Sequence, residues 1–171
     1  FYAAHAIERR IGTVAALDVP SRAITLEDGE RLAPDAVLIA SGGTPNRLRV
    51  EGGDLDGVFT LRSVEDSEGI IADAQGKGAA VVVGASFIGL EVAASLTAMG
   101  VETTVVAPEE VPLERGFGAA IGGRIRRLHE RHGVKFRLGR GVAALRGSSH
   151  VESVLLDDGA ELPAHFVVLG V

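Results

Sequence analysis

The sequence predicts an α/β fold in which a parallel β-sheet is joined to an antiparallel β-meander. Continuous apolar runs at residues 79–83 and 101–106 are typical of strands buried on both faces, and a helical spacing of apolar residues lies between them. A second helix and strand follow. After them come short apolar runs around a hairpin signal at Asp158-Gly159, and these runs predict the meander.

The first forty residues have the pattern of sheet. Residues 11–17 and 23–26 are strand candidates on either side of a turn, and Asp28-Gly29 is a hairpin signal that begins a short return strand. Residues 36–40 form a continuous apolar run, which predicts a strand buried on both faces. This run ends where two glycines and a proline force the backbone to turn.

The next segment leads into the first helix. Residues 46–57 are typical of a polar loop, and residues 58–61 predict a short strand. Ser63 and Asp66 have the spacing of a capping box, so a helix is expected to start there and to run through Ile71.

Strands and helices alternate through the rest of the chain. A helix over residues 87–99 ends at Gly100, which is placed as a C-terminal cap, and a helix over residues 119–132 leads to a strand at 134–136. A strand–helix–strand–helix–strand order implies a parallel sheet, because parallel strands need such crossover connections. The remaining predicted strands are residues 142–145, 151–156 and 166–171.

The turn after residues 79–83 carries the most specific motif. Gly84-Ala85-Ser86-Phe87-Ile88-Gly89 has the first and last glycines of G-x-G-x-x-G, with Ser86 at the middle position. Gly84 permits the tight turn, Gly89 permits close helix packing, and the start of the helix attracts a pyrophosphate. The hydroxyl of Ser86 either donates to a phosphate or caps the helix. The strand and helix around this motif predict a Rossmann-like dinucleotide site, and the alternative is a plain turn without a ligand.

An acidic residue is expected at the end of the second strand, where it would bind ribose hydroxyls. That position is near Ala107, which is not acidic, while Glu109 and Glu110 follow two and three residues later. Either glutamate reaches the ribose, or both are merely solvated. No arginine follows at once to take a 2′-phosphate, although Arg115 lies further on, so the sequence favours NAD over NADP.

Composition excludes several classes of function. The net charge is −6 and no lysine-rich patch exists, which argues against nucleic-acid binding. The absence of cysteine excludes disulfides and a thiol redox centre and is compatible with a cytoplasmic protein. No apolar run reaches the ~18 residues that span a bilayer. The five histidines have no metal-ligand spacing, and we expect no metal site and no catalytic acid, base or nucleophile.

Three motifs together resemble one family. Residues 81–94 are similar to the NAD-domain fingerprint of FAD-dependent pyridine nucleotide–disulfide oxidoreductases, closest to the ferredoxin and rubredoxin reductase-like branch. Residues 35–43 resemble the second FAD-contacting motif of that family, and residues 58–63 resemble the strand that leads back into its NAD domain. The resemblance implies a partial FAD-binding domain over residues 1–62. It also implies an NAD(P)-binding domain over residues 63–171 that is truncated at its last strand.

The resemblance also implies roles for particular residues. The glycine turn would hold the dinucleotide, with Glu91 and Gly170 near the nicotinamide, although an ordinary helix glutamate is an equal alternative for Glu91. The first FAD fingerprint and the later Gly-Asp motif of the family are not in this chain, so FAD is expected in a longer parent. The expected contacts to NAD or FAD are Gly84, Ser86, Phe87, Ile88, Gly89, Glu91, Glu109, Gly170, Ala40, Ser41 and Gly42.

The function implied by the resemblance is electron transfer. NADH would pass hydride to FAD, and the electrons would leave singly for a ferredoxin, a Rieske-type protein or a rubredoxin, with the redox chemistry belonging to the cofactors. The isolated chain is not expected to be active. A dinucleotide-binding module or sensor without turnover is the alternative, and a nitrite reductase or coenzyme A disulfide reductase relative is a third reading. Several apolar strands in residues 1–60 would lack neighbouring strands in this chain, and the exposed apolar surface could be covered in a homodimer.

Overall fold

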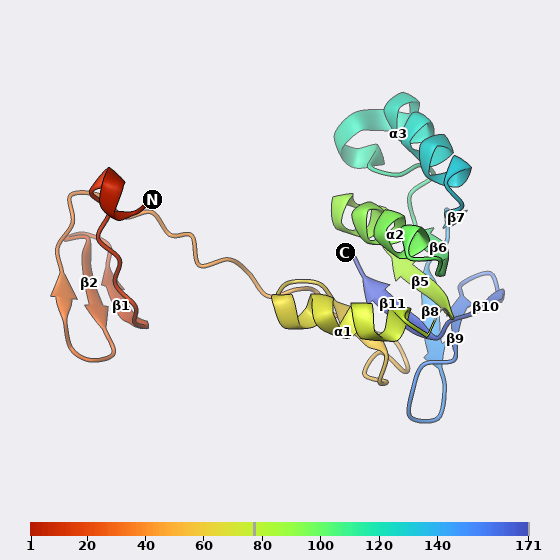
Figure 1. The fold of residues 1–171 in the computed structure, drawn as a ribbon, viewed down its shortest axis with the longest axis horizontal. Coiled ribbons are helices and arrows are strands. Elements are labelled where there is room, and N and C mark those ends of the chain that lie inside the picture. Colours follow the sequence, from red (N-terminus) through yellow and green to blue (C-terminus); the bar gives the residue numbers. More distant parts are fainter. Residues whose placement is uncertain (77, 171) are drawn as a thin grey trace. The chain divides into compact units, whose positions relative to one another are not determined.

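The computed structural model describes residues 1–76 and 78–170, and the chain divides into two compact units. Unit 1 is Phe1–Gly43 and unit 2 is Thr44–Val171 (Figure 1). The boundary after residue 62 between an FAD-binding and an NAD(P)-binding domain stays a prediction, and the compact units divide the chain after Gly43.

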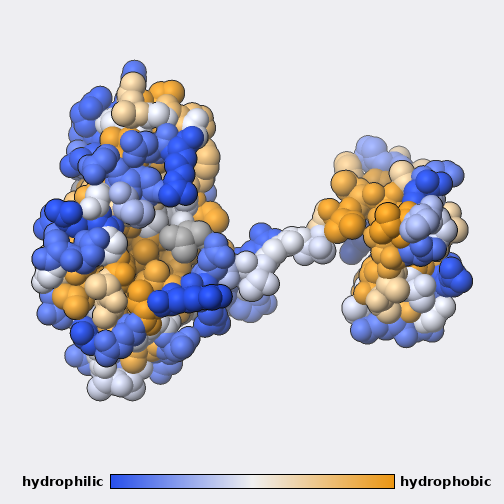
Figure 2. Space-filling model, turned by 180° about the vertical axis from the view of Figure 1, so that it is seen from behind, coloured by the Kyte–Doolittle hydropathy of each residue, from blue (hydrophilic) through white to orange (hydrophobic). Residues whose placement is uncertain are grey.

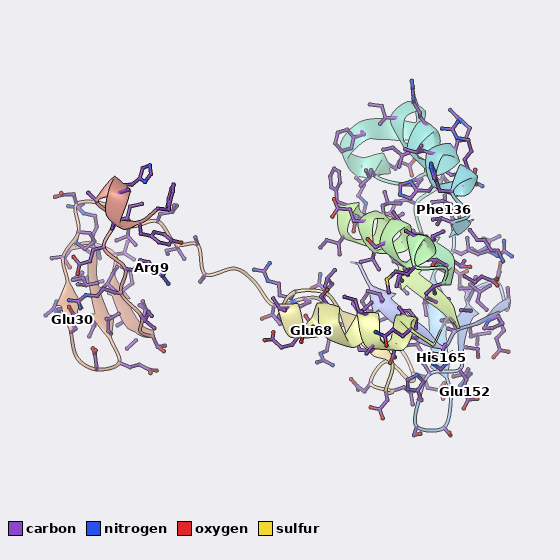
Figure 3. The ribbon with its side chains drawn as sticks, viewed as in Figure 1. Arg9, Glu30, Glu68, Phe136, Glu152 and His165 are labelled. Atoms are coloured by element: carbon purple, nitrogen blue, oxygen red, sulfur yellow. The ribbon has the colours of Figure 1, made fainter. Side chains whose placement is uncertain are left out.

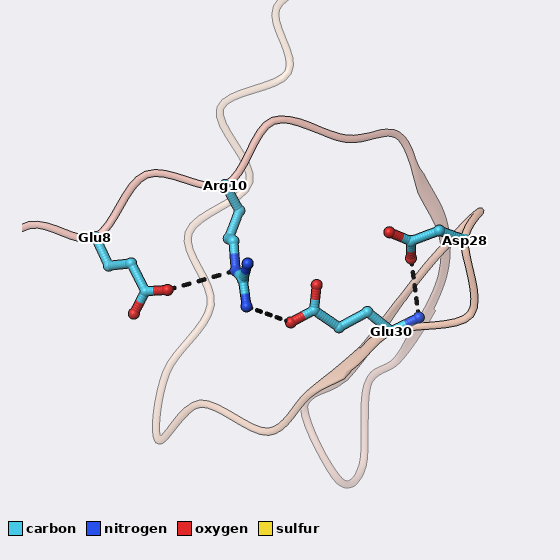
Figure 4. A network of polar contacts seen from close by, with 4 residues as sticks. All are labelled: Glu8, Arg10, Asp28 and Glu30. Atoms are coloured by element: carbon cyan, nitrogen blue, oxygen red, sulfur yellow. Dashed lines mark hydrogen bonds and ion pairs between the residues drawn. The ribbon is translucent and has the colours of Figure 1, made fainter.

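Unit 1 is a small antiparallel sheet preceded by a short 3₁₀ helix, Ala3–His5. Its strands are β1 (Val14–Asp18), β2 (Ala23–Leu26) and β3 (Arg31–Leu32), and β2 lies in the middle. The expected hairpin at Asp28-Gly29 is confirmed, because it joins β2 to β3. The side chain of Asp28 accepts a hydrogen bond from the Glu30 backbone N–H at 2.9 Å, and Arg10 bridges the carboxylates of Glu8 and Glu30 (Figure 4).

Few apolar side chains of unit 1 are buried. Among its described residues only Ala23 and Leu26 belong to the core, whereas Ile11 is 94% exposed. Figure 2 shows apolar side chains at the surface of both units. Because domains of about 40 residues bury too little surface to be stable without a further constraint, the three strands of unit 1 form a weak core by themselves.

The strand expected at residues 36–40 is not formed, so this prediction was wrong. The segment has no strand pairing, and Leu38 and Ile39 are 90% and 70% exposed. A strand buried on both faces needs neighbouring strands to satisfy its backbone N–H and C=O groups. None of the described residues pairs with this segment, so its apolar pattern does not produce a strand.

Unit 2 contains a five-stranded parallel sheet in the order β4-β11-β5-β6-β7 and a three-stranded antiparallel meander in the order β10-β9-β8. The predicted α/β fold with a parallel sheet and a meander is confirmed. The elements are β4 (Val58–Thr60), α1 (Val64–Ala74), β5 (Ala79–Val83), α2 (Phe87–Ala98), β6 (Glu102–Ala107), α3 (Glu114–Arg131), β7 (Lys135–Leu138), β8 (Val142–Arg146), β9 (Ser153–Leu156), β10 (Glu161–Pro163) and β11 (Phe166–Leu169).

The position of β4 explains the early division between the units. Val58 of β4 pairs in parallel with Val167 of β11, so the strand is an edge of the parallel sheet. The segment before it is also tied to unit 2, because the backbone N–H of Leu145 donates to the Glu51 carbonyl at 2.8 Å. Residues 44–62 therefore fold with the parallel sheet and its meander.

The parallel sheet is the middle of three layers. Helices α1, α2 and α3 lie on one face of it and the meander lies on the other (Figure 1). Alternate residues of β5 show this directly: Val82 packs in the helix-side core and Val81 in the meander-side core, and both are fully buried. Burial of both faces is why the strands are continuous apolar runs.

Most predicted elements of unit 2 are confirmed, with shifts at their ends. The capping box at Ser63 and Asp66 is formed, and α1 continues beyond Ile71 to Ala74. Helix α3 begins at Glu114 instead of residue 119, and Gly118 interrupts it with a left-handed backbone (φ 72°). Strand β10 was not predicted. The strand expected at 166–171 ends at Leu169, and Val171 lies outside the described residues.

Candidate functional site

The turn between β5 and α2 is built by close backbone contacts. Gly84 has φ 107°, a conformation that side-chain-bearing residues rarely adopt. A Cβ on Gly89 would lie 2.0 Å from the Gly84 carbonyl oxygen, and a Cβ on Gly170 would lie 2.7 Å from the Gly89 Cα. The backbones that follow β5 and β11 and the backbone of α2 therefore approach one another at three glycines. A side chain at Gly89 or Gly170 would push them apart.

Ser86 is the N-cap of α2. Its Oγ accepts a hydrogen bond from the Gly89 backbone N–H at 3.3 Å and donates one to the Gly170 carbonyl at 2.5 Å. The hydroxyl thus caps the helix and ties it to the end of β11, so of its two expected roles the structure shows capping. The backbone N–H groups of Phe87 and Ile88 are in the first helical turn, where no intrahelical acceptor exists.

A cleft of about 490 Å³ opens at the carboxyl ends of the central strands. The chain leaves β5 for β6 on one side, while β11 pairs with β5 on the other, so this edge is the topological switch point of the sheet. Ligands of open α/β sheets bind in such crevices, and the volume is within the range of small-molecule sites. The lining residues are Gly84, Ala85, Ser86, Phe87, Pro108, Glu109, Leu113, Glu114, Arg115, Gly116, Phe117 and Gly170.

Glu109 and Glu110, which the sequence did not distinguish, are separated by the structure. Glu109 lines the cleft, its side chain is 24% exposed, and its carboxylate lies 3.3 Å from the guanidinium of Arg115. The carboxylate of Glu110 instead lies beside Gly139, at the turn after β7. Glu109 is therefore the one of the two glutamates that lines the cleft.

The wall opposite the glycine turn was missed by the sequence analysis. It comes from the start of α3, where the Leu113 backbone N–H donates to the Ala85 carbonyl at 3.1 Å and brings Arg115 and Phe117 into the cleft. The predicted helix began only at residue 119, so residues 114–118 were not expected to form part of it. The available signal was Arg115, which lies close in sequence to the expected ribose-binding position.

Ile88 and Glu91 do not line this cleft. They line a second hollow of about 380 Å³ between α1 and α2, together with apolar residues such as Ile70, Leu96 and Met99. Glu91 is exposed on α2. The structure therefore places these two predicted contacts away from the others. The predicted contacts that it brings together in the cleft are Gly84, Ser86, Phe87, Glu109 and Gly170. Gly89 is buried behind the turn.

The predicted flavin contacts Ala40, Ser41 and Gly42 belong to unit 1. All three are exposed in a stretch without strand pairing, next to the exposed Leu38 and Ile39. A flavin ring needs an enclosing apolar surface, and exposed residues in an unpaired stretch do not provide one. The described residues thus do not enclose a flavin by themselves.

Within residues 1–76 and 78–170, no group of three or more potential ligands is placed to hold a metal ion. His150 and His165 are neighbours, with ring centroids 5.5 Å apart, and His165 lies near Glu152 in Figure 3. His129 lies on α3 against Phe136 of β7, with ring centroids 6.3 Å apart. No helix in the described part of the chain is long and apolar enough to span a membrane.

The parallel sheet, the glycine turn and the cleft at the switch point define a Rossmann-type α/β domain. Residues 2–171 match the pyridine nucleotide-disulphide oxidoreductase family. The chain belongs to this family, which confirms the resemblance of its sequence motifs.

Relatives of the chain include an apoptosis-inducing factor and a ferredoxin–NAD(+) reductase component. The chain is 35% identical to apoptosis-inducing factor 3 of Mus musculus, with all of this chain and 28% of that protein covered. It is 33% identical to the biphenyl dioxygenase system ferredoxin–NAD(+) reductase component of Paraburkholderia xenovorans, with all of this chain and 42% of that protein covered. The chain thus spans less than half the length of these relatives.

Solved structures of ferredoxin and putidaredoxin reductases are also similar to this chain. A ferredoxin reductase from Rhodopseudomonas palustris matches with a TM-score of 0.87 and 29% identity, over 99% of this chain and 42% of that one. Putidaredoxin reductase, in a covalent complex with putidaredoxin, matches with a TM-score of 0.81 and 32% identity, over 99% of this chain and 42% of that one.

Proposed function

We propose that the cleft of unit 2 binds NAD(P)H, with NADH preferred over NADPH. In the longer protein, this NADH would reduce FAD, and electrons would pass to a ferredoxin-type or Rieske-type iron–sulfur carrier. The observation that carries the proposal is the cleft itself: Gly84, Ser86, Phe87, Glu109 and Gly170 converge at the switch point of the parallel sheet. Family membership supports the same function.

The pyrophosphate would bind at the start of α2. The free N–H groups of Phe87 and Ile88 and the positive end of the helix dipole favour an anion there. Gly89 lets the start of the helix approach the turn closely, because a Cβ there would lie 2.0 Å from the Gly84 carbonyl oxygen. Ser86 contributes by holding the turn, because its hydroxyl is engaged with Gly89 and Gly170.

The two halves of the dinucleotide would extend in opposite directions from the pyrophosphate. The adenosine half would lie along the end of β6, with its ribose hydroxyls donating to Glu109. The nicotinamide half would pass Gly170 toward the Ile88 and Glu91 side of α2, a role for Glu91 that rests on the family resemblance. Ala40, Ser41 and Gly42 would contact FAD only within the complete protein.

We also propose that the protein acts in the cytoplasm and forms homodimers. The absence of cysteine suits a reducing compartment. The exposed apolar side chains of unit 1, such as Ile11 and Leu38, are surface that self-association would cover.

Titration of the 171-residue chain with NADH and NADPH by calorimetry tests the proposal. We expect one saturable site for NADH and weaker binding of NADPH. No binding of either nucleotide by a folded chain would contradict the dinucleotide site. In the full-length protein, NADH should bleach a visible flavin absorbance under anaerobic conditions, whereas binding without any flavin would indicate a module or sensor without turnover.

Glu109→Gln is expected to reduce the preference for NADH over NADPH by at least about ten-fold. Hydrogen bonds from the ribose hydroxyls to a charged carboxylate would be weakened, which lowers NADH affinity. NADPH would gain, because the negative charge beside its 2′-phosphate is removed and Arg115 is released from its ion pair. Dissociation constants from calorimetry measure the ratio. Glu110→Gln is the matched control and should leave it unchanged; an equal change in both variants would contradict the role of Glu109.

A further inference from the structure

Two exposed phenylalanines meet at the mouth of the cleft. The side chains of Phe87 and Phe117 are 59% and 47% exposed, and their rings are perpendicular with centroids 5.8 Å apart. Both residues line the cleft. Aromatic rings are usually buried because of their large apolar area, so an exposed pair beside a ligand-sized cleft is a candidate for ring stacking.

Phe117 is carried by a helical turn of its own. This turn, residues 114–117, is bounded by two left-handed residues, Leu113 (φ 55°) and Gly118 (φ 72°). A Cβ built on Gly116 or on Gly118 would meet no atom within 4 Å, so these two positions are not packed against the rest of unit 2. Phe117, between these two glycines, belongs to neither buried core cluster of unit 2.

The contacts that do fix this turn lead to the proposed ligand-binding residues. The Leu113 backbone N–H donates to the carbonyl of Ala85 in the glycine turn, and Arg115 is paired with the Glu109 carboxylate. The turn is thus anchored at one end to the pyrophosphate position and along its side to the ribose position. Phe117 on this turn lines the same cleft as Glu109, which follows β6, and its ring meets Phe87 at the start of α2.

We propose that Phe117 stacks on the adenine ring of the dinucleotide. This inference rests on the proposed function and deepens it, because it assigns the base-binding surface of the same site. The adenosine half of a dinucleotide extends from the pyrophosphate toward the second strand of the sheet motif, which here is β6. An aromatic face offers adenine a stacking partner, and Phe87 supports that face edge-on at the start of α2.

The test compares the two halves of the ligand on the full chain. Phe117→Ala should weaken binding of NADH and of ADP-ribose by about 5- to 150-fold, the range for loss of one base–aromatic stacking contact. Binding of reduced nicotinamide mononucleotide should not change. Ile121→Ala, an exposed apolar residue of the same helix that does not line the cleft, is the matched control and should bind all three ligands as the unmodified chain does.

A second variant supplies a direct optical signal. The chain has no tryptophan, so Phe117→Trp introduces a single indole. Its fluorescence should be quenched by ADP-ribose and not by nicotinamide mononucleotide, and NADH affinity should be close to that of the unmodified chain because the stacking face is kept. Unchanged ADP-ribose binding by a folded Phe117→Ala variant would overturn the stacking role of Phe117 and leave the proposed function intact. Failure of the unmodified chain to bind NADH or ADP-ribose would overturn the proposed function and this inference with it.

Discussion

Gly89→Ala is expected to abolish NADH binding, with a loss of affinity of at least about 100-fold, and to destabilise unit 2. The added methyl group would lie 2.0 Å from the Gly84 carbonyl oxygen and 3.4 Å from Cγ1 of Val82. Neither neighbour can move easily, because Gly84 is backbone in a tight turn and Val82 is fully buried. Helix α2 must therefore move away from β5, which costs about 1–3 kcal/mol as overpacking does elsewhere.

The movement of α2 has a direct consequence for the ligand. The start of α2 would shift relative to Gly170, which lines the cleft with Phe87, and a displacement of about 1 Å is enough to disrupt a positioned contact. Calorimetric titration with NADH and thermal unfolding measure the two effects on the same sample. Binding comparable to the unmodified chain would show that the ligand does not depend on this close approach.

Gly123→Ala is the matched control for this substitution. Gly123 is on α3 outside the lining of the cleft, and a Cβ there would meet only the Arg127 guanidinium at an ordinary 3.6 Å. Alanine is favoured over glycine inside a helix by about 0.5–1 kcal/mol. This variant should be as stable as the unmodified chain or slightly more so and should bind NADH equally well. A parallel loss of binding in both variants would point to a general effect of helix substitutions.

The central part of unit 2 could be predicted because several local signals agree there. Residues 79–83 are apolar without interruption, Gly84 and Gly89 mark the turn, and the α2 spacing is helical, so β5, α2 and β6 lie within one residue of their expected bounds. Burial on both faces of the parallel sheet is the physical reason for such plain patterns. The same pattern at residues 36–40 predicted a strand that is not formed, because an apolar run does not supply the paired backbone that a strand needs.

The candidate site was predictable on one side only. The glycine turn follows from residue types at fixed spacing, and Glu109 follows from its distance along the chain. The opposite wall depends on how the segment after β6 folds back, through the Leu113 to Ala85 hydrogen bond and the left-handed backbone at Leu113 and Gly118. No local pattern in the sequence encodes that return. The choice between Glu109 and Glu110 likewise required knowing which carboxylate faces the cleft.

Phe166→Ala is expected to lower the free energy of unfolding of unit 2 by about 3–5 kcal/mol. The ring of Phe166 is fully buried in the helix-side core, and its centroid lies 6.4 Å from that of Phe59 on the neighbouring strand. Strand β11 is flanked on both sides by paired strands, so the sheet cannot collapse easily into the space that the ring leaves. The remaining cavity adds to the lost transfer free energy of the ring.

Chemical denaturation followed by far-UV circular dichroism measures this change, with the exposed Phe117→Ala variant as the control for the same chemical substitution. Phe117 is 47% exposed, so its loss should change the free energy of unfolding by less than about 1 kcal/mol. A small effect of Phe166→Ala would show that β11 is not held as a central strand of a close-packed sheet. Gly170 directly follows β11, and its carbonyl accepts the Ser86 hydroxyl, so the cleft would then lack the rigid support that the proposed NADH site requires.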